Sequence, residues 1–309
     1  MQTFGLVMLI ISSSLSIALV ALGLSALSRC IGVVPLETLP VGIGFSLVLL
    51  SMGRTNSAAT LSGSDLAPFV IGFTVILFLL HPLYVVWRRR MGGESISLMI
   101  SFAIMTCWIQ CMSIRTESKS ISPEFPNSLR AHQDLYIKIF VILTSIALLS
   151  LICHLIRLDG RLAALQLSMS DSRLLTTFGV SSLACQRIVL AISIFLITIG
   201  SLLYICLQQN FSFQNSYDII VPAFAVSLSQ TRIRPGSFAL IAIFLLAGIE
   251  CLTRFSAEST IREGHQAILF GGVVLFALIW RIAKFSGRSE SIERRWGVWY
   301  RRVLGGNSG

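Results

Sequence analysis

Long apolar runs separated by short polar segments dominate the pattern along the chain. The runs lie near residues 4–27, 39–52, 66–87, 95–114, 135–156, 183–207, 219–229, 237–253 and 266–284. Most of them approach or exceed the roughly 20 residues that a helix needs to cross a bilayer. The first run lacks a basic segment before it, so we expect an uncleaved first helix. The pattern predicts an all-α polytopic membrane protein with eight or nine transmembrane helices in a single domain over residues 1–309.

Two of the runs are short and are flanked by residues that interrupt helices. The run at 219–229 carries Pro222 and is followed by Arg-Pro-Gly at 234–236. The run at 39–52 has an entry with two prolines and an acid, namely Pro35, Glu37 and Pro40. Broken or re-entrant helices have this pattern, and they are tolerated only where protein or water lines them. Small residues that allow close helix packing are Gly42, Gly44, Gly200, Ser201, Gly271 and Gly272.

Composition supports the same class of protein. Hydrophobic residues make up 54% of the chain and charged residues 12%, whereas a soluble domain carries about 25% charged residues. The net charge of +10 fits cytoplasmic loops better than nucleic-acid binding, because no soluble basic face is visible. The seven cysteines show neither zinc nor disulfide spacing. The lipid bilayer is therefore the expected surrounding, and no nucleic-acid partner is expected.

The placement of lysine and arginine predicts the orientation in the membrane. Most of the 24 basic residues fall on one side if three segments are cytoplasmic: Arg88 to Arg90, residues 157–182 and the tail at 285–309. Cytoplasmic loops carry such an excess. The C-terminus is then inside, and the N-terminus is outside if all nine runs cross.

The polar segment at 157–182 resembles a soluble helix inserted between two spans. Arg161, Asp171 and Arg173 are polar positions beside an interrupted apolar stripe, and Gly179 is a plausible helix stop. One interpretation is an amphipathic helix lying on the inner leaflet. The other is a short helix docked in a groove of a soluble partner.

The same segment resembles a known family. Gly160-Arg161, Asp171 and the stretch "LLTTFGVSSLACQRIVLAISIFLITIGSLL" are similar to the cytoplasmic loop and following helix of ABC importer permeases of the branched-chain amino-acid and urea type. Further segments resemble that family in the same order: "IALVALGLSALSRCIGVVPLETLPVGIGF", "VVWRRRMGGESISLMISFAIMTCWIQ", "VPAFAVSLSQTRIRPGSFALIAIFLLAGIECL" and "STIREGHQAILFGGVVLFALIWR". The resemblance covers essentially the whole chain.

The chain departs from the family pattern in several places. Ala164, Leu165 and Gln166 stand where the family has basic residues, and the spacing from Gly160 to Gly179 is longer than usual. Pro35-Leu36-Glu37-Thr38 replaces an Asn-x-Ala-His region. The resemblance therefore describes a divergent member, and the solute is not inherited from it.

The resemblance implies a set of partners and a role for the polar segment. It implies that the segment docks onto cytoplasmic ATP-binding subunits, with coupling contacts at Gly160, Arg161, Asp171, Arg173 and Gly179. It further implies a second permease subunit, the same or related, an extracytoplasmic solute-binding protein and a bacterial-type cytoplasmic (inner) membrane. The expected solute is small and polar, such as an amino acid or an amide like urea.

The chain shows no motif for covalent chemistry. It lacks G-x-x-x-x-G-K-[ST], G-x-S-x-G and H-E-x-x-H, so we expect no enzyme activity, no cofactor and ATP hydrolysis in a separate partner. His81, His132, His154 and His265 are far apart in sequence, and no metal site is expected.

Three polar residues are candidates for the substrate pathway. Glu250 lies inside an apolar run, where a carboxylate faces a cavity or partner or else reaches the headgroups. Glu37 lies at the irregular entry of the run 39–52, where it lines the path or belongs to a cytoplasmic loop end. Gln110 contacts the solute or bonds a neighbouring helix. The alternatives to an ABC permease are an ion-gradient-driven secondary transporter, a membrane-embedded enzyme and a non-transporting scaffold protein.

Overall fold

The structure is a computed structural model that describes a set of separate ranges. These are residues 2–31, 34–52, 63–90, 94–116, 133–158, 182–208, 211, 213–229, 235–255 and 272. Within these ranges the chain is all-helical and holds no β-strand. The prediction of an all-α protein is confirmed for this part of the chain. The predicted run at 266–284 lies outside the described residues except for Gly272.

In the described ranges, eight α-helices form at eight of the nine predicted apolar runs, and a 3₁₀ helix that no run predicted precedes the seventh of these α-helices. They are α1 (Gln2–Ile31), α2 (Thr38–Met52), α3 (Gly63–Arg90), α4 (Glu94–Arg115), α5 (Gln133–Leu158), α8 (Ser182–Leu207), η2 (Phe213–Ser216), α9 (Tyr217–Ser229) and α10 (Pro235–Phe255). Long uninterrupted apolar segments become helices in lipid because a helix satisfies every backbone hydrogen bond within itself.

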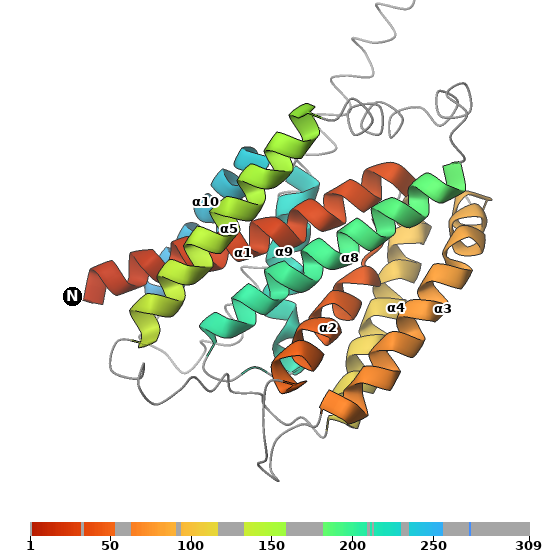
Figure 1. The fold of residues 1–309 in the computed structure, drawn as a ribbon, viewed down its shortest axis with the longest axis horizontal. Coiled ribbons are helices and arrows are strands. Elements are labelled where there is room, and N and C mark those ends of the chain that lie inside the picture. The colour runs from red at the N-terminus through yellow and green to blue at the C-terminus, as the bar shows by residue number, and fades with distance from the viewer. Residues whose placement is uncertain are drawn as a thin grey trace, which may run out of the picture.

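The helices form a bundle around α1 and α8 (Figure 1). α1 packs most extensively against α8 and also contacts α5, α9 and α10, while α2 packs against α8 and α3. α3 and α4 lie on one side of the bundle, and α5 and α10 lie on the other. α1 and α8 are antiparallel, because Gly23 of α1 faces Leu196 while Val20 faces Gly200 of α8.

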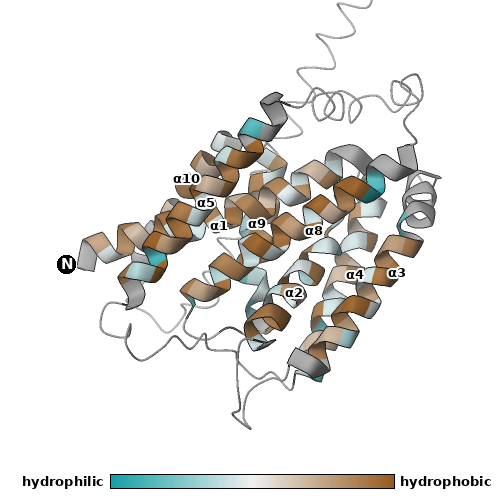
Figure 2. Cartoon of the chain, viewed as in Figure 1, coloured by the Kyte–Doolittle hydropathy of each residue, from teal (hydrophilic) through white to brown (hydrophobic). Residues whose placement is uncertain are grey.

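The helices have the apolar character of a membrane-embedded protein. Four of them contain segments long and apolar enough to cross a bilayer: Phe4–Ser28, Ser97–Arg115, Leu135–Ile152 and Gln186–Leu207. Four shorter apolar segments occur in α2, α3, α9 and α10. Hydrophobic residues run along all of the labelled helices (Figure 2), and large apolar side chains such as Met99, Phe140 and Phe244 are exposed. Lipid is the solvent that suits such a surface.

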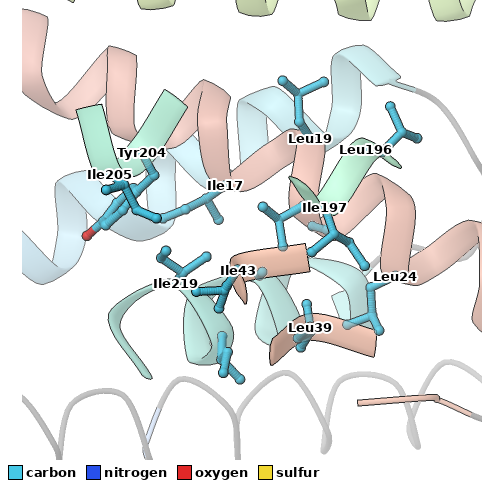
Figure 3. Packing of buried hydrophobic residues seen from close by; sticks show 14 of the residues in the cluster. Ile17, Leu19, Leu24, Leu39, Ile43, Leu196, Ile197, Tyr204, Ile205 and Ile219 are labelled. Atoms are coloured by element: carbon cyan, nitrogen blue, oxygen red, sulfur yellow. The ribbon is translucent and has the colours of Figure 1, made fainter. Parts of the chain in front are cut away.

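The core lies where α1, α2, α8 and α9 meet. Figure 3 shows Ile17 and Leu24 of α1, Ile43 of α2, Ile197 of α8 and Ile219 of α9 packed together. Because the lipid is as apolar as these side chains, close packing and not transfer from water holds such helices together.

Glycines allow the close approach of α1, α2 and α8. A Cβ built on Gly200 would lie 2.8 Å from the carbonyl oxygen of Ser16, and one on Gly42 would overlap Cγ2 of Ile197. The predicted packing role is confirmed for Gly42, Gly44 and Gly200, and Ser201 is fully buried. Gly271 lies outside the described residues, and Gly272 has no described neighbour within 4 Å of a Cβ.

Candidate functional site at the break between α1 and α2

Two long helices are each followed by non-helical backbone and a short helix. After α1 the segment Val34–Glu37 is not α-helical, and α2 has 15 residues. After α8 come η2 and then α9, which has 13 residues. The short helix α2 packs against α8, and the short helix α9 packs against α1. Each short helix therefore packs on the long helix of the other pair.

The first break, Val34–Glu37, lies in a buried stretch of backbone whose polar groups form hydrogen bonds with neighbouring residues. All residues from 35 to 40 are buried. The N–H of Thr38 donates to the carbonyl oxygen of Pro35 at 3.2 Å, and the hydroxyl of Thr38 donates to the same oxygen at 2.8 Å. The N–H of Leu39 donates to the carbonyl oxygen of Leu36 at 3.1 Å. Non-helical backbone away from water needs such partners.

The proline at the start of α2 fits this local structure. Pro40 is the third residue of α2, and the first N–H groups of a helix have no partner within the helix. A proline there removes no hydrogen bond, and its fixed φ suits the first turn. The predicted irregular entry before the run 39–52 is therefore confirmed, and the sequence Pro35 to Pro40 accounts for it.

Ser101 of α4 connects this break to the neighbouring helix. Its hydroxyl oxygen is hydrogen-bonded to Oε2 of Glu37, lies 3.1 Å from the carbonyl oxygen of Val34 and accepts the N–H of Leu36 at 3.2 Å. Ser101 is fully buried and Glu37 is 1% exposed. One serine thus holds three of the four residues of the break against α4.

The position of α4 is set in part by aromatic stacking. The ring of Trp108 lies 5.1 Å from that of Phe69 and 3.9 Å from that of Phe73, both on α3, with interplanar angles of 9° and 20°. Stacked aromatic pairs add about 0.5–1.5 kcal/mol beyond the area they bury. The stack fixes α4 against α3, two helical turns from Ser101, and so helps to place the serine.

The short helix α2 is also tied to α8. The hydroxyl of Ser46 donates to the carbonyl oxygen of Thr198 in α8 at 2.7 Å. Hydrogen bonds from serine side chains to a neighbouring helix help to hold helices together inside membranes. The break between α1 and α2 is therefore fixed on one side through Ser101 and on the other through Ser46.

The structure separates Glu37 from Gln110, and it does not describe the side chain of Glu250. Glu37 lies in the buried break, whereas Gln110 is exposed on α4, beside Cys107 and Cys111. Nine residues along a helix correspond to about 13 Å, so Gln110 is far from Ser101 of the same helix. Glu250 lies in α10, which packs against α1, α5 and α9, and its side chain is outside the described part.

The predicted coupling residues lie outside the described residues. Gly160, Arg161, Asp171, Arg173 and Gly179 all belong to the stretch 159–181. Their coupling role, and the membrane-surface alternative, both remain predictions.

Sequence reasoning missed Ser101. Ser97 and Ser101 are spaced four residues apart, and Met105, Trp108 and Met112 continue the same buried face of α4. Two serines at helical spacing within an apolar run were the available signal, because small polar residues mark contacts between helices in membranes.

The site has the chemistry of a polar contact inside a bundle. Among the described residues, no group of three or more His, Cys, Asp or Glu is placed to hold a metal ion.

Comparison of the chain with models of protein families, with characterised proteins and with solved structures gave no significant match.

Proposed function

We propose that the protein is the transmembrane permease subunit of an ABC importer and forms half of a translocation pathway. The observation that carries the proposal is the crossed arrangement of two long helices and two short ones, with an interruption of the α-helix after α1 and after α8 and buried non-helical backbone at the first of these. Irregular backbone at membrane depth occurs where it lines a pathway or is enclosed by protein, and transporters use it for their binding sites.

The proposal that ATP hydrolysis drives transport rests on the resemblance of the sequence to ABC importer permeases. In this proposal the chain crosses the bacterial-type cytoplasmic membrane eight or nine times and performs no covalent chemistry. A second permease subunit completes the path, and a solute-binding protein delivers an amino acid or an amide such as urea. Cytoplasmic ATP-binding subunits push on residues 157–182, and the attached spans move as rigid bodies.

One observation favours a second candidate, a secondary transporter driven by an ion gradient. Glu37 is a buried carboxyl group at a broken helix. Ion-driven transporters place acids and interrupted helices together in this way. The source of energy separates the two candidates.

A transport assay in liposomes tests the proposal directly. The purified chain is reconstituted alone, or with the ATPase, second permease and binding protein from neighbouring reading frames, and uptake of radiolabelled leucine and urea is measured. We expect uptake only with the partners and internal ATP, and we expect it to survive collapse of proton and sodium gradients. Uptake by the chain alone, driven by either gradient, would favour the secondary transporter.

A charge reversal tests the coupling segment. Arg161→Glu should abolish co-purification with the ATPase while membrane insertion stays intact, because the cytoplasmic segment then repels its partner surface. The matched control is Arg115→Glu, which reverses an exposed charge at the end of α4, on the opposite side in our predicted orientation. Equal co-purification of the two variants would contradict the coupling role.

A further inference from the structure

The two sides of α4 have different surroundings. One side is buried against the bundle and holds Ser101 and Trp108. The centre of the opposite side is exposed and consists of four residues at alternating intervals of four and three, here called the Gln110 face: Ala103, Cys107, Gln110 and Ile114. Residues at this spacing lie along one line of a helix and form the seam where two helices cross at a shallow angle. The Gln110 face therefore has the geometry of a helix contact.

Gln110 does not suit a surface that faces lipid. Its amide forms no hydrogen bond with the part of the chain that the structure describes. An amide in hydrocarbon without a partner is unfavourable. The other glutamines of the described helices, Gln2, Gln133 and Gln186, lie within the first five residues of their helices. Gln110 is therefore the described glutamine that most needs a partner inside the membrane.

Helix geometry directs Gln110 away from the nearer membrane surface. The span Ser97–Arg115 ends five residues after Gln110, which is about 7.5 Å along the helix axis. Side chains of a helix lean toward its N-terminus, and from Gln110 that direction leads toward the middle of the span. Because the nearer end is the C-terminal one, the amide leans away from the closest headgroups, and we expect its partner within the membrane.

The exposed face of α5 has the composition that lipid favours. Through the middle of its span it exposes large apolar side chains, namely Ile139, Phe140, Leu143 and Ile146. The Gln110 face instead combines an amide with the small residues Ala103 and Cys107, which allow a second helix to approach closely. The contrast indicates that lipid covers this face of α5 and that protein covers the Gln110 face of α4.

We propose that the Gln110 face is the contact surface for a second copy of this chain. Copies in one membrane share their orientation, so the two-fold axis of a dimer is perpendicular to the membrane and the two α4 helices run parallel. In such an isologous contact each residue near the axis meets its own counterpart. A glutamine amide carries both donors and an acceptor, so the NH₂ group of each Gln110 donates to the carbonyl oxygen of the other.

This self-complementary chemistry favours a second copy over other occupants. An apolar helix would leave the amide without a partner, and a charged helix would bring an ion into the membrane. The inference rests on the proposed function for the need of a second permease subunit, and it gives that subunit an identity and a surface. Association needs neither solute nor ATP, so it is measured separately from transport.

Disulfide crosslinking in membranes tests the contact. Cys107 lies on the Gln110 face, and two cysteines can form a disulfide only when their Cα atoms lie within about 7 Å. The other six of the seven cysteines are replaced by alanine, and membranes that hold the full chain are oxidised with copper phenanthroline. We expect a covalent dimer on a non-reducing gel, which returns to the monomer on reduction.

The matched control places a cysteine on the face that lipid covers. Leu143→Cys is introduced into a chain without its native cysteines, because Leu143 is 63% exposed in the middle of α5. It should give no dimer under the same oxidation. A dimer as abundant as that of Cys107 would show random collision and overturn the proposal. Failure of Cys107 to crosslink would also overturn it, whether lipid or the run at 266–284 covers the Gln110 face.

A second measurement keeps the native cysteines and so does not depend on the folding of the cysteine-depleted chain. Copies with a donor or an acceptor fluorescent protein at the C-terminus are mixed in micelles, and energy transfer is followed as the detergent concentration rises. Gln110→Leu should weaken the dimer about threefold to tenfold, the size expected for hydrogen bonds between helices inside membranes. Ser150→Leu, which removes an exposed hydroxyl from α5, should leave the dimer unchanged.

Two outcomes of this second measurement would overturn the proposal. One is equal dimerisation of Gln110→Leu and the wild type. The other is a wild type that stays monomeric alone and pairs only with a related permease from a neighbouring reading frame. That second result would leave the proposed function intact, whereas a dimer without ATP-dependent uptake would leave the Gln110 face intact and count against the proposed function.

Discussion

The two breaks in the bundle are built from different chemistry. After α1 the chain is attached to α4 by polar contacts between Ser101 and the residues Val34–Glu37. After α8 the connection is closed by Phe211 and Phe213, which are 1% and 2% exposed, and η2 packs against the same helix α4. One break is held by hydrogen bonds to a buried serine, and the other by the packing of two buried phenylalanine rings.

This difference indicates where movement is easiest. Hydrogen bonds break one at a time when water enters, whereas a buried phenyl ring leaves a cavity if it is displaced. α4 contacts both breaks, and its stack with Phe69 and Phe73 ties it to α3. We therefore expect α4 to stay with the Phe211 side when the Glu37 side opens.

The largest loss of stability should come from a substitution at the break after α8, which Phe211 and Phe213 fill. Phe211→Ala removes a fully buried ring and should lower the free energy of unfolding in mixed micelles by about 3 kcal/mol, because a cavity remains. Phe244→Ala is the matched control, since Phe244 is 77% exposed on α10 and makes few contacts within the chain. An equal loss for the two variants would show that packing around Phe211 does not hold the second break.

The second largest loss of stability should come from the contact between the long helices α1 and α8, which precede the two breaks. In Gly200→Ala the new Cβ would lie 2.8 Å from the carbonyl oxygen of Ser16 and 3.0 Å from the nitrogen of Val20. These are backbone atoms, so α1 and α8 must separate, at a cost of about 1–3 kcal/mol.

Gly72→Ala provides the control for that substitution. Gly72 is also inside a helix but has no described atom within 4 Å of a Cβ, and alanine favours the helix by up to about 1 kcal/mol. Thermal unfolding should place the two variants on opposite sides of the wild type. A neutral Gly200→Ala would mean that the two long helices are not in tight contact at this position.

The sequence predicted the helices well because run length alone determines them in lipid. It also predicted the irregular entry to α2, since Pro35, Glu37 and Pro40 each disfavour a continuous apolar helix. The predicted close contacts at Gly42 and Gly200 are confirmed. Each of these features is local, so neighbouring residues carry the signal.

The serine spacing marks Ser101 as a contact residue, but its pairing with Glu37 could not be predicted from the sequence for a physical reason. Ser101 is 64 residues away, and the contact depends on how α4 is rotated about its axis. A helix that is apolar on all sides, such as α4, has almost no periodicity to define its buried face. The same ambiguity explains why Gln110 was a pathway candidate although its side chain is exposed on α4.

A smaller loss of stability should come from a substitution at the break after α1, which Ser101 holds by hydrogen bonds. Ser101→Ala removes the group that joins Glu37, Val34 and Leu36 to α4, and it should lower the free energy of unfolding by about 1–2 kcal/mol. Ser145→Ala is the control, because Ser145 of α5 is equally buried and its hydroxyl has no hydrogen-bond partner among the described residues. That variant should be neutral or slightly stabilising in the same assay. A loss as large as that of Phe211→Ala would remove the distinction between the two breaks.

The smallest effect should come from the indole nitrogen of Trp108. Its N–H has no hydrogen-bond partner within the described part of the chain, while its ring stacks on Phe69 and Phe73. Trp108→Phe keeps an aromatic face and loses no hydrogen bond, so we expect a change of less than about 1 kcal/mol. Trp108→Leu loses the stack and should lower the free energy of unfolding more than Trp108→Phe does. If the phenylalanine variant proved as unstable as the leucine variant, the ring stack would not be what positions α4 beside the two breaks.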